Sequence, residues 1–255
     1  MPRSFSYSAL TLRVKSSGES NREAWFLTAE EGVLRATVFG GPKSRLRAQV
    51  APFHEGTLMI YHDPVRDSRK VSDFDVHSYR TGLREVYERA MAADAVAETV
   101  LSSHGGGGGW PAAAKLARSV LDSLDGADVP LCSRLGIYFL WHWAGVLGSR
   151  PELSACASCA REAKRDEALW YSAANEALFC ENCARESSPG FETARPSLIR
   201  LCPGARLWLS GIESLPPSAL ARVTLDTPSL EQARTFSKVV LAGALGKRLA
   251  TWDGI

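Results

Sequence analysis

Two Cys-x2-Cys pairs constrain the fold of this chain more than any other feature of its sequence. Cys156 and Cys159 form the first pair, Cys180 and Cys183 form the second, and 20 residues lie between the pairs. A tight turn at each pair can aim two thiolates at one metal ion, so the spacing predicts a tetrahedral Zn²⁺ site with four cysteine ligands. Four thiolates leave no position for a reacting water, and we therefore expect the zinc to be structural.

The residues around the cysteines predict a separate module over residues 154–186. Leu169–Ser172 and Ala177–Phe179 are typical of two short strands, and a hairpin between them would bring the two cysteine pairs together. Four thiolates on Zn²⁺ leave a net negative charge, which nearby basic side chains can offset. These are Arg161, Lys164, Arg165 and Arg185.

Two other interpretations of the four cysteines remain open. In the first, the four cysteines are unrelated buried thiols. In the second, one pair is a redox site, but the βαβ setting typical of a redox pair is missing here. Cys132 and Cys202 have no partner at this spacing and are predicted to be buried apolar thiols.

The first 78 residues predict a small β-barrel. Apolar and polar residues alternate in Leu10–Lys15 and again in Val33–Phe39, which is the period of a half-buried strand. Further β-rich runs are separated by glycine and proline turns. These runs are Trp25–Thr28, Thr57–His62 and Val71–Val76. About five short strands in so short a segment favour an OB-fold.

From about residue 80 the apolar residues recur at helical spacing instead. The predicted fold class is therefore α+β: an OB-fold barrel over residues 1–78, then an α-helical domain over residues 79–255. The zinc-finger hairpin is inserted into the second domain at 154–186. Five consecutive glycines, Gly105–Gly109, predict a flexible loop between two helices, and no strand or Gly-Lys-Ser/Thr sequence accompanies them to make a phosphate loop.

Composition and the longest apolar stretch restrict the class of protein and its expected location in the cell. The formal net charge of the 255 residues is only +2, so partners must be inferred from where the charges lie. The most apolar stretch, Leu135–Leu147, is shorter than the ~20 residues of a membrane span and predicts a buried helix. The N-terminus has no apolar region of a signal peptide, which favours a cytoplasmic protein with reduced thiols.

The segment from Gly32 to His54 contains basic residues and no acidic residue. Strand alternation places Arg35 and Phe39 together on the outer face of their strand. It likewise places Arg13 and Lys15 on the outer face of an earlier strand. A basic surface with an aromatic ring suits single-stranded nucleic acid, because cations hold the backbone and rings stack on bases. The predicted DNA-binding residues are Arg13, Lys15, Arg35, Phe39, Lys43, Arg45 and Arg47. The alternative is an ordinary solvated charged face.

Several segments together resemble the RecO family of bacterial recombination mediators. They are residues 9–12, 27–34, 40–47, 52–53, 145–148 and 151–153, followed by the first cysteine pair and the hairpin to the second. The order of barrel, helices, zinc hairpin and helices is more specific than any one motif. Residues 173–176 depart from the family, whose hairpins often carry glycines at that turn, and the glycine run at 105–109 is no recognised family feature.

The resemblance implies a protein without catalytic activity that acts in DNA repair and homologous recombination. It implies binding of single-stranded and duplex DNA without sequence specificity, annealing of complementary strands, and loading of RecA on DNA coated by single-strand-binding protein. The implied partners are RecR, RecF and RecA of the same pathway, and the C-terminal tail of single-strand-binding protein; the implied location is the nucleoid. The helical domain offers several basic side chains that could bind the acidic tail. They are Lys115, Arg118, Lys238, Lys247 and Arg248.

Two rival functions come from other classes. Some DNA glycosylases combine an N-terminal proline with a four-cysteine finger, but they have glutamate where this chain has Arg3, and their finger ends the chain. The other rival is an interaction scaffold that does not bind DNA, with an incidental basic loop. DNA binding by residues 1–78 alone would separate it from a recombination mediator.

Overall fold

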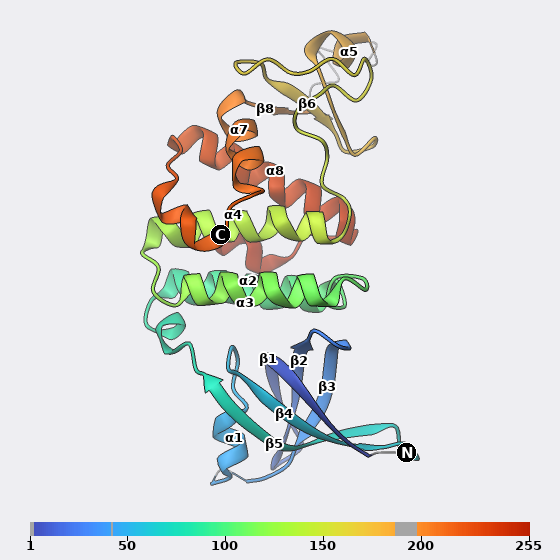
Figure 1. Cartoon of the computed structure of the whole chain (residues 1–255), viewed down its shortest axis with the longest axis vertical. Coiled ribbons are helices and arrows are strands. Elements are labelled where there is room, and N and C mark those ends of the chain that lie inside the picture. Colours follow the sequence, from blue (N-terminus) through green and yellow to red (C-terminus); the bar gives the residue numbers. More distant parts are fainter. Residues whose placement is uncertain (1–2, 42, 187–197) are drawn as a thin grey trace. The chain divides into compact units, whose positions relative to one another are not determined.

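The computed structural model describes residues 3–41, 43–186 and 198–255. The chain divides into two compact units, Met1–Ala127 and Asp128–Ile255. Figure 1 shows a β-barrel and two long helices in the first unit, and further helices with a small sheet in the second.

The barrel of the first unit is closed, with strand order β1-β2-β3-β5-β4. β3 and β5 pair in parallel, the other pairs are antiparallel, and β1 pairs with β4 to complete the closure. The strands are β1 (Ser4–Ser17), β2 (Asn21–Thr28), β3 (Gly32–Val38), β4 (Glu55–Asp63) and β5 (Ser68–Ser78), and the one-turn helix α1 (Arg45–Gln49) follows β3. This five-stranded barrel, followed by helices, confirms the predicted fold class.

Alternating apolar residues fill the barrel, as the sequence period predicts. Leu34, Ala36 and Val38 of β3 face the core, and the rings of Phe26 and Phe74 meet edge to face with centroids 5.8 Å apart. Burial of these apolar surfaces, at about 25 cal/mol per Å², is the main favourable term for this unit.

The alternation of Leu10–Lys15 is broken by a β-bulge. The register of β1 shifts between Thr11 and Arg13, so Leu10 pairs with Leu27 whereas Val14 pairs with Ala24. Leu27 and Ala24 lie on opposite faces of β2, and only Val14 packs against the barrel core. The simple alternation predicted for Leu10 and Val14 on one face is therefore wrong, because the bulge inserts one residue between them.

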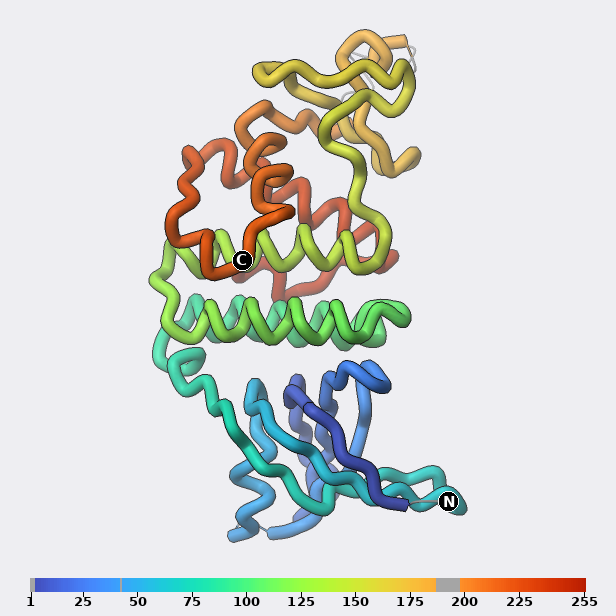
Figure 2. The backbone as a smooth tube through the Cα atoms, viewed as in Figure 1, coloured from blue at the N-terminus to red at the C-terminus, as the bar shows by residue number. Residues whose placement is uncertain are grey.

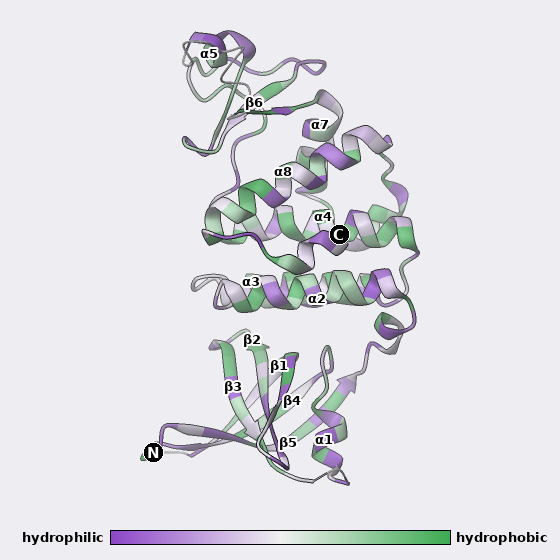
Figure 3. Cartoon of the chain, turned by 180° about the vertical axis from the view of Figure 1, so that it is seen from behind, coloured by the Kyte–Doolittle hydropathy of each residue, from purple (hydrophilic) through white to green (hydrophobic). Residues whose placement is uncertain are grey.

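Two helices complete the first unit, after the short 3-10 turn η1 (Thr81–Arg84): α2 (Tyr87–Ser102) and α3 (Trp110–Leu124). They run side by side in Figure 2, and hydrophobic residues gather along both in Figure 3. The glycine run joins them, and a Cβ added at Gly105 would lie 3.2 Å from the Val33 side chain, so the loop contacts the β2–β3 turn. The domain boundary at residue 78 remains a prediction.

A buried ion network connects the barrel to α3. The Arg80 side chain is only 2% exposed; its guanidinium pairs with Glu55 of β4, and its Nε lies 2.7 Å from Asp122 of α3. Arg118 lies 3.1 Å from the same Glu55 and donates to the Ser8 carbonyl at 2.7 Å. Arg80, Arg118 and Glu55 compensate one another where they are buried, as buried charges require, and the exposed Asp122 adds a second carboxylate to Arg80.

The second unit has a helical part and a small sheet. α4 and α8 pack together, and the fully buried Trp141 of α4 lies against Phe236 of α8 with ring centroids 5.8 Å apart. The elements are α4 (Val129–Val146), β6 (Leu169–Ser172), β7 (Ala177–Phe179), α5 (Glu181–Glu186), β8 (Leu198–Leu201), α7 (Pro203–Ile212), η3 (Pro217–Arg222), α8 (Thr227–Leu245) and η4 (Ala250–Gly254). The hairpin strands β6 and β7 have the bounds that the sequence predicts, and β8 adds an unpredicted third strand beside β6.

Candidate metal centre and nucleic-acid interface

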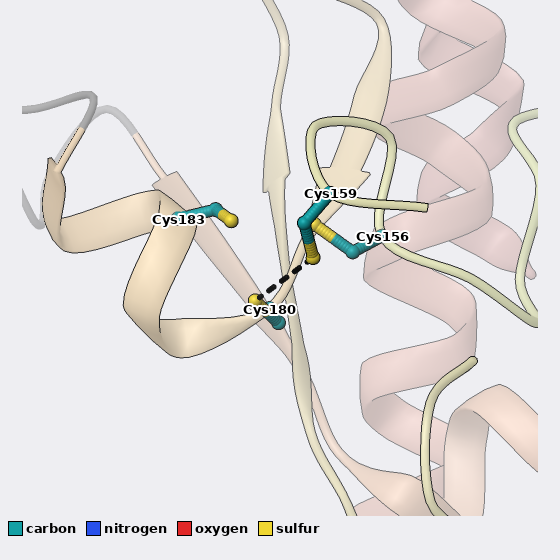
Figure 4. Close-up of side chains that lie close together, drawn as sticks. All are labelled: Cys156, Cys159, Cys180 and Cys183. Carbon is teal, nitrogen blue, oxygen red and sulfur yellow. Dashed lines mark hydrogen bonds between the residues drawn. The ribbon is translucent and has the colours of Figure 1, made fainter. Parts of the chain in front are cut away.

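The four cysteines of the two pairs converge on one point. The sulfurs of Cys156, Cys159, Cys180 and Cys183 all lie within 4.8 Å of one another, and the Cys159 and Cys180 sulfurs are 4.0 Å apart. Figure 4 shows the side chains approaching from the two knuckles. Zinc bonded to four sulfurs at about 2.3 Å holds them about 3.8 Å apart, so small shifts complete the shell. The cluster therefore fits a zinc ion.

Backbone hydrogen bonds build the first knuckle and attach it to the hairpin. Ala160 adopts a left-handed conformation, with φ of 55°, and its N–H donates to the Cys156 carbonyl at 2.9 Å. The next residue, Ala157, donates to the Leu178 carbonyl of β7 at 2.8 Å. The loop thus presents two thiols beside the strand that leads directly to Cys180.

The second knuckle lies where β7 ends and α5 begins. Cys180 follows the last residue of β7, and Cys183 lies in the first turn of α5. The N–H of Ala184 donates to the Cys180 carbonyl at 2.9 Å, which closes the turn. Buried Arg206 of α7 donates to the Leu153 carbonyl at 3.1 Å and thereby holds the segment that enters the first knuckle.

The thiol pKa values indicate a cluster that favours a cation. Burial alone would raise the pKa of Cys156, but backbone N–H groups of Cys159, Cys180 and Ser158 donate to its sulfur and lower the pKa to about 6. Its neighbours Cys180 and Cys159 instead raise the pKa of Cys183 to about 12. Thiolates this close repel one another, and a divalent metal ion relieves that repulsion.

The predicted DNA-binding residues of the strands share the outer face of β1, β2 and β3. Arg13 is opposite Trp25, and Trp25 is opposite Arg35, so one row crosses three strands. Lys15 is opposite Glu23 in the adjacent row, and its ammonium lies 5.9 Å from the centre of the Trp25 ring. Sequence reasoning missed Trp25, although its place between two polar residues of a strand carried the same alternation signal.

Two acidic groups approach this row. Arg35 is largely exposed, with an ion pair to Glu23 at 3.6 Å. Arg13 is half-buried, and its charge acts on Asp94 of α2, where burial raises the carboxyl pKa and Arg13 lowers it. Lys15 and Arg35 are consequently the more accessible cations of this row.

Phe39 extends the outer face beyond the end of β3. Phe39 is 45% exposed, and the Lys70 ammonium lies 5.3 Å from the centre of its ring. Lys70 comes from β5, which meets β3 at the Thr37–Lys70 position. Lys70 is not among the DNA-binding residues predicted from the sequence, because the parallel pairing of two distant strands has no local signal.

The remaining predicted cations follow Phe39 in the turn and in α1. Lys43 and Arg45 are exposed and Arg47 is half-buried, whereas Leu46 packs against the barrel core. Gly40 has φ of 127°, and a Cβ there would lie 2.6 Å from the Ser44 hydroxyl. A glycine is therefore required for the chain to turn into α1 at this point.

The outer face formed by β4, β5 and the start of β1 has a different chemistry. Ser6, Met59 and Asp73 form one row across the three strands, and Ser8, Thr57 and Asp75 form the next. All six side chains are exposed. The barrel thus carries cations and aromatic rings on one outer face, and hydroxyl groups and carboxylates on another.

An OB-type barrel with a basic aromatic face, joined to a helical unit with a four-cysteine site, defines a class of nucleic-acid-associated proteins. Two family models match: "Recombination protein O N terminal" over residues 1–79 and "Recombination protein O C terminal" over residues 84–250. The chain belongs to the RecO family, whose members are mediators of DNA repair and recombination rather than catalytic enzymes. A search of curated proteins finds no matching relative.

The family assignment also indicates what kinds of partner this protein has. DNA and proteins of the recombination pathway are the partners that the family implies in general. Across residues 3–41, 43–186 and 198–255, no helix has both the length and the apolar character needed to cross a membrane.

Proposed function

We propose that this protein binds single-stranded and duplex DNA without sequence specificity through the outer face of β1, β2 and β3 and the adjoining α1 turn. It anneals complementary strands there and, with RecR and RecF, helps RecA to load on DNA coated by single-strand-binding protein. The observation that carries the proposal is the continuous series of cations and rings on this face. It comprises Lys15, Trp25, Arg35, Phe39, Lys70, Lys43, Arg45 and Arg47, with a lesser part for Arg13.

The chemistry of this face supports backbone contact over base reading. Lys and Arg neutralise phosphates, and the exposed Phe39 ring and the Trp25 ring offer surfaces for stacking on unpaired bases. The predicted contacts are strand residues and the five-residue helix α1, which is too short to lie in a major groove and read base edges. Two strands held by their backbones keep their base edges free to pair, which is what annealing requires.

The test of the DNA site is the salt dependence of binding by the full chain. The triple variant Lys43→Ala, Arg45→Ala, Arg47→Ala should lose about 2 from the slope of log affinity against log salt, at about 0.7 per phosphate contact on single strands. Arg66→Ala removes an exposed cation from the β4–β5 turn and should leave the slope nearly unchanged. An unchanged slope in the triple variant would exclude this site.

A specific observation also favours one position for the tail of single-strand-binding protein. Lys238 and Arg248, two of the candidate helical cations, line a cavity of about 390 Å³ on α8, and Val239 and Ala242 contribute apolar surface to it. An acidic C-terminal peptide with an apolar residue suits this combination. Arg118 is engaged by buried Glu55 and by Ser8. Arg248 also has a partner, Asp253, but that ion pair is exposed, and Lys238 donates only to the Ile255 carbonyl, so a peptide carboxylate would have to displace these two contacts.

Fluorescence anisotropy with a labelled acidic tail peptide tests this second contact. The double variant Lys238→Ala, Arg248→Ala should weaken peptide binding at least ten-fold, because two charge-assisted contacts are removed. Lys115→Ala changes an exposed lysine of the other unit and serves as the control. Equal affinity of the double variant and the parent chain would remove this cavity from the proposal.

A further inference from the structure

The short helix η4 and the residue after it bring Asp253 and Ile255 to the edge of the cavity on α8. Trp252 of η4 is fully buried, and its carbonyl accepts a hydrogen bond from the Ile255 N–H at 3.2 Å. Ile255 is buried as well and lies against Gly136 of α4, where an added Cβ would be 2.3 Å from the Ile255 Cγ2 atom. The absence of a side chain at Gly136 thus makes the space that Ile255 occupies.

The same two residues engage the two cations of the cavity. Asp253 forms an ion pair with Arg248, and the Lys238 ammonium donates to the Ile255 carbonyl at 3.2 Å. All four residues line the cavity. The chain therefore places a carboxylate and a buried apolar side chain of its own beside Lys238 and Arg248.

This combination matches the chemistry of the peptide proposed for the cavity. An acidic peptide with an apolar residue would bring a carboxylate to Arg248 or Lys238, and an apolar side chain to the surface beside them. A second carboxylate at Arg248 would lie next to that of Asp253, and like charges so close repel each other. The peptide and the segment of residues 253–255 consequently compete for the same cations.

The segment is held weakly enough to be released. Both side chains of the Arg248–Asp253 pair are 65% exposed, and a pair so exposed contributes little in water. The segment nevertheless belongs to the same chain as the cavity, which keeps its effective concentration high. Weak contacts can therefore compete with a free peptide.

We propose that residues 253–255 are an internal competitor, which occupies the acidic-peptide site on α8 until a peptide displaces it. The inference rests on the proposed binding of an acidic tail in this cavity. Its consequence is that the parent chain binds the peptide more weakly than the open cavity would, by a factor set by the fraction of molecules in which the segment is released.

Fluorescence anisotropy with the labelled acidic tail peptide tests this competition in the full chain. Asp253→Asn removes the carboxylate but keeps the size of the side chain, and should strengthen peptide binding about two- to five-fold at low salt. Ile255→Ser removes the buried apolar contact and should strengthen binding by a similar factor. The double variant should exceed both single variants, with a gain of about ten-fold.

Asp166→Asn and Val129→Ser are the matched controls. Asp166 is an exposed carboxylate of the zinc module, and Val129 is 49% exposed at the start of α4. Neither residue lines the cavity, so both variants should bind the peptide like the parent chain. If Asp166→Asn gained as much affinity as Asp253→Asn, the change in net charge alone would explain the effect, and the internal competitor would be rejected.

Hydrogen exchange of the parent chain, followed by NMR, supplies a second readout. A peptide that only covers a surface slows the exchange of the amides beneath it. Displacement should instead accelerate exchange at the Ile255 amide, because its hydrogen bond to the Trp252 carbonyl is lost when the segment leaves. Exchange on α8 should slow at the same time.

The outcomes separate the internal competitor from the peptide site. A parent chain that binds the peptide with the same affinity as Asp253→Asn and the double variant, without faster exchange at Ile255, would overturn the internal competitor alone. If neither the parent chain nor the folded double variant binds the peptide, the assignment of the cavity fails, and this inference fails with it.

Discussion

The zinc module and the basic barrel face are both built on short β-hairpins, yet they differ in charge and in origin. Residues 154–186 contain four Lys and Arg residues and six Asp and Glu residues, and the thiolates of a zinc complex add further negative charge. The α5 segment of this module is hydrophilic in Figure 3. On the barrel face, cations predominate around Glu23. A cysteine knuckle in a DNA-repair protein therefore does not by itself indicate where DNA binds.

Removal of the metal should give the largest effect and should divide the two regions. Cys156→Ser with Cys180→Ser, or a strong chelator, removes about 10 kcal/mol of binding free energy from the module. We expect faster hydrogen exchange over residues 154–186 and a lower melting temperature, with an unchanged salt slope for DNA binding. Cys202→Ser, outside the cluster, is the control. Unchanged melting after zinc is stripped would contradict a structural metal.

The first unit depends instead on its core and its buried ion network. Arg80→Met removes a buried cation and leaves Glu55 with Arg118 as its remaining partner, while the exposed Asp122 is solvated by water. We therefore expect a loss at the lower end of the range for broken buried pairs, about 3 kcal/mol. We expect a lower urea midpoint for the first unit and an unchanged zinc content. The exposed Arg66→Met should have almost no effect on stability. Loss of zinc from Arg80→Met would show that the two regions are not independent.

Acid should affect the second unit through His142. Burial and, to a smaller extent, the charge of Arg150 lower the pKa of this histidine to about 4, although a hydrogen bond with the Ile212 carbonyl partly opposes the shift. The unfolded chain, with a pKa near 6.5, binds this proton first, so the neutral ring contributes stability that is complete above about pH 6.5 and is lost as the pH falls to about 4.

The loss amounts to no more than about 3 kcal/mol over this pH range. Melting curves of His142→Gln and the parent chain, each recorded with excess zinc between pH 7 and 4.5, isolate the contribution. The variant should lose less stability than the parent on acidification. Parallel pH profiles for the two proteins would show that His142 carries no such linkage.

The two regions also differ in how far the sequence could predict them. The knuckles were predictable because their ligands, their turns and the bounds of β6 and β7 are all encoded within about 30 neighbouring residues, a range set by ligand spacing. The barrel face is assembled from four strands. Its alternation revealed Arg35 and Phe39, but the β3–β5 pairing that brings Lys70 to Phe39 depends on the closed barrel.

Local rules also failed where one residue changes the register. The bulge in β1 places Leu10 and Val14 on opposite faces of the strand. Nothing in the alternating pattern of the sequence marks the inserted residue. The strand β8 was missed because its pairing with β6 spans almost 30 residues. The sequence predicts that Gly105 lies in a loop. Its contact with Val33 could not be predicted, because that contact depends on α2 ending beside the β2–β3 turn.

The smallest expected effect concerns Glu23, the carboxylate between Lys15 and Arg35 on the barrel face. Glu23→Gln removes its 3.6 Å ion pair with Arg35 and frees that guanidinium for phosphate. Because a surface pair in water is worth at most about 1 kcal/mol, affinity for single-stranded DNA should rise about two- to four-fold at low salt and less at high salt. Equilibrium titration at two ionic strengths measures it.

Asp75→Asn is the control for this change, because it removes the same charge from the β4–β5 face of the same barrel. If DNA lies on the β1–β3 face, Asp75→Asn should raise affinity less than Glu23→Gln, since its carboxylate is farther from the phosphates and more fully screened. Equal gains from the two substitutions would mean that only net charge matters, and the distinction between the two barrel faces would no longer stand.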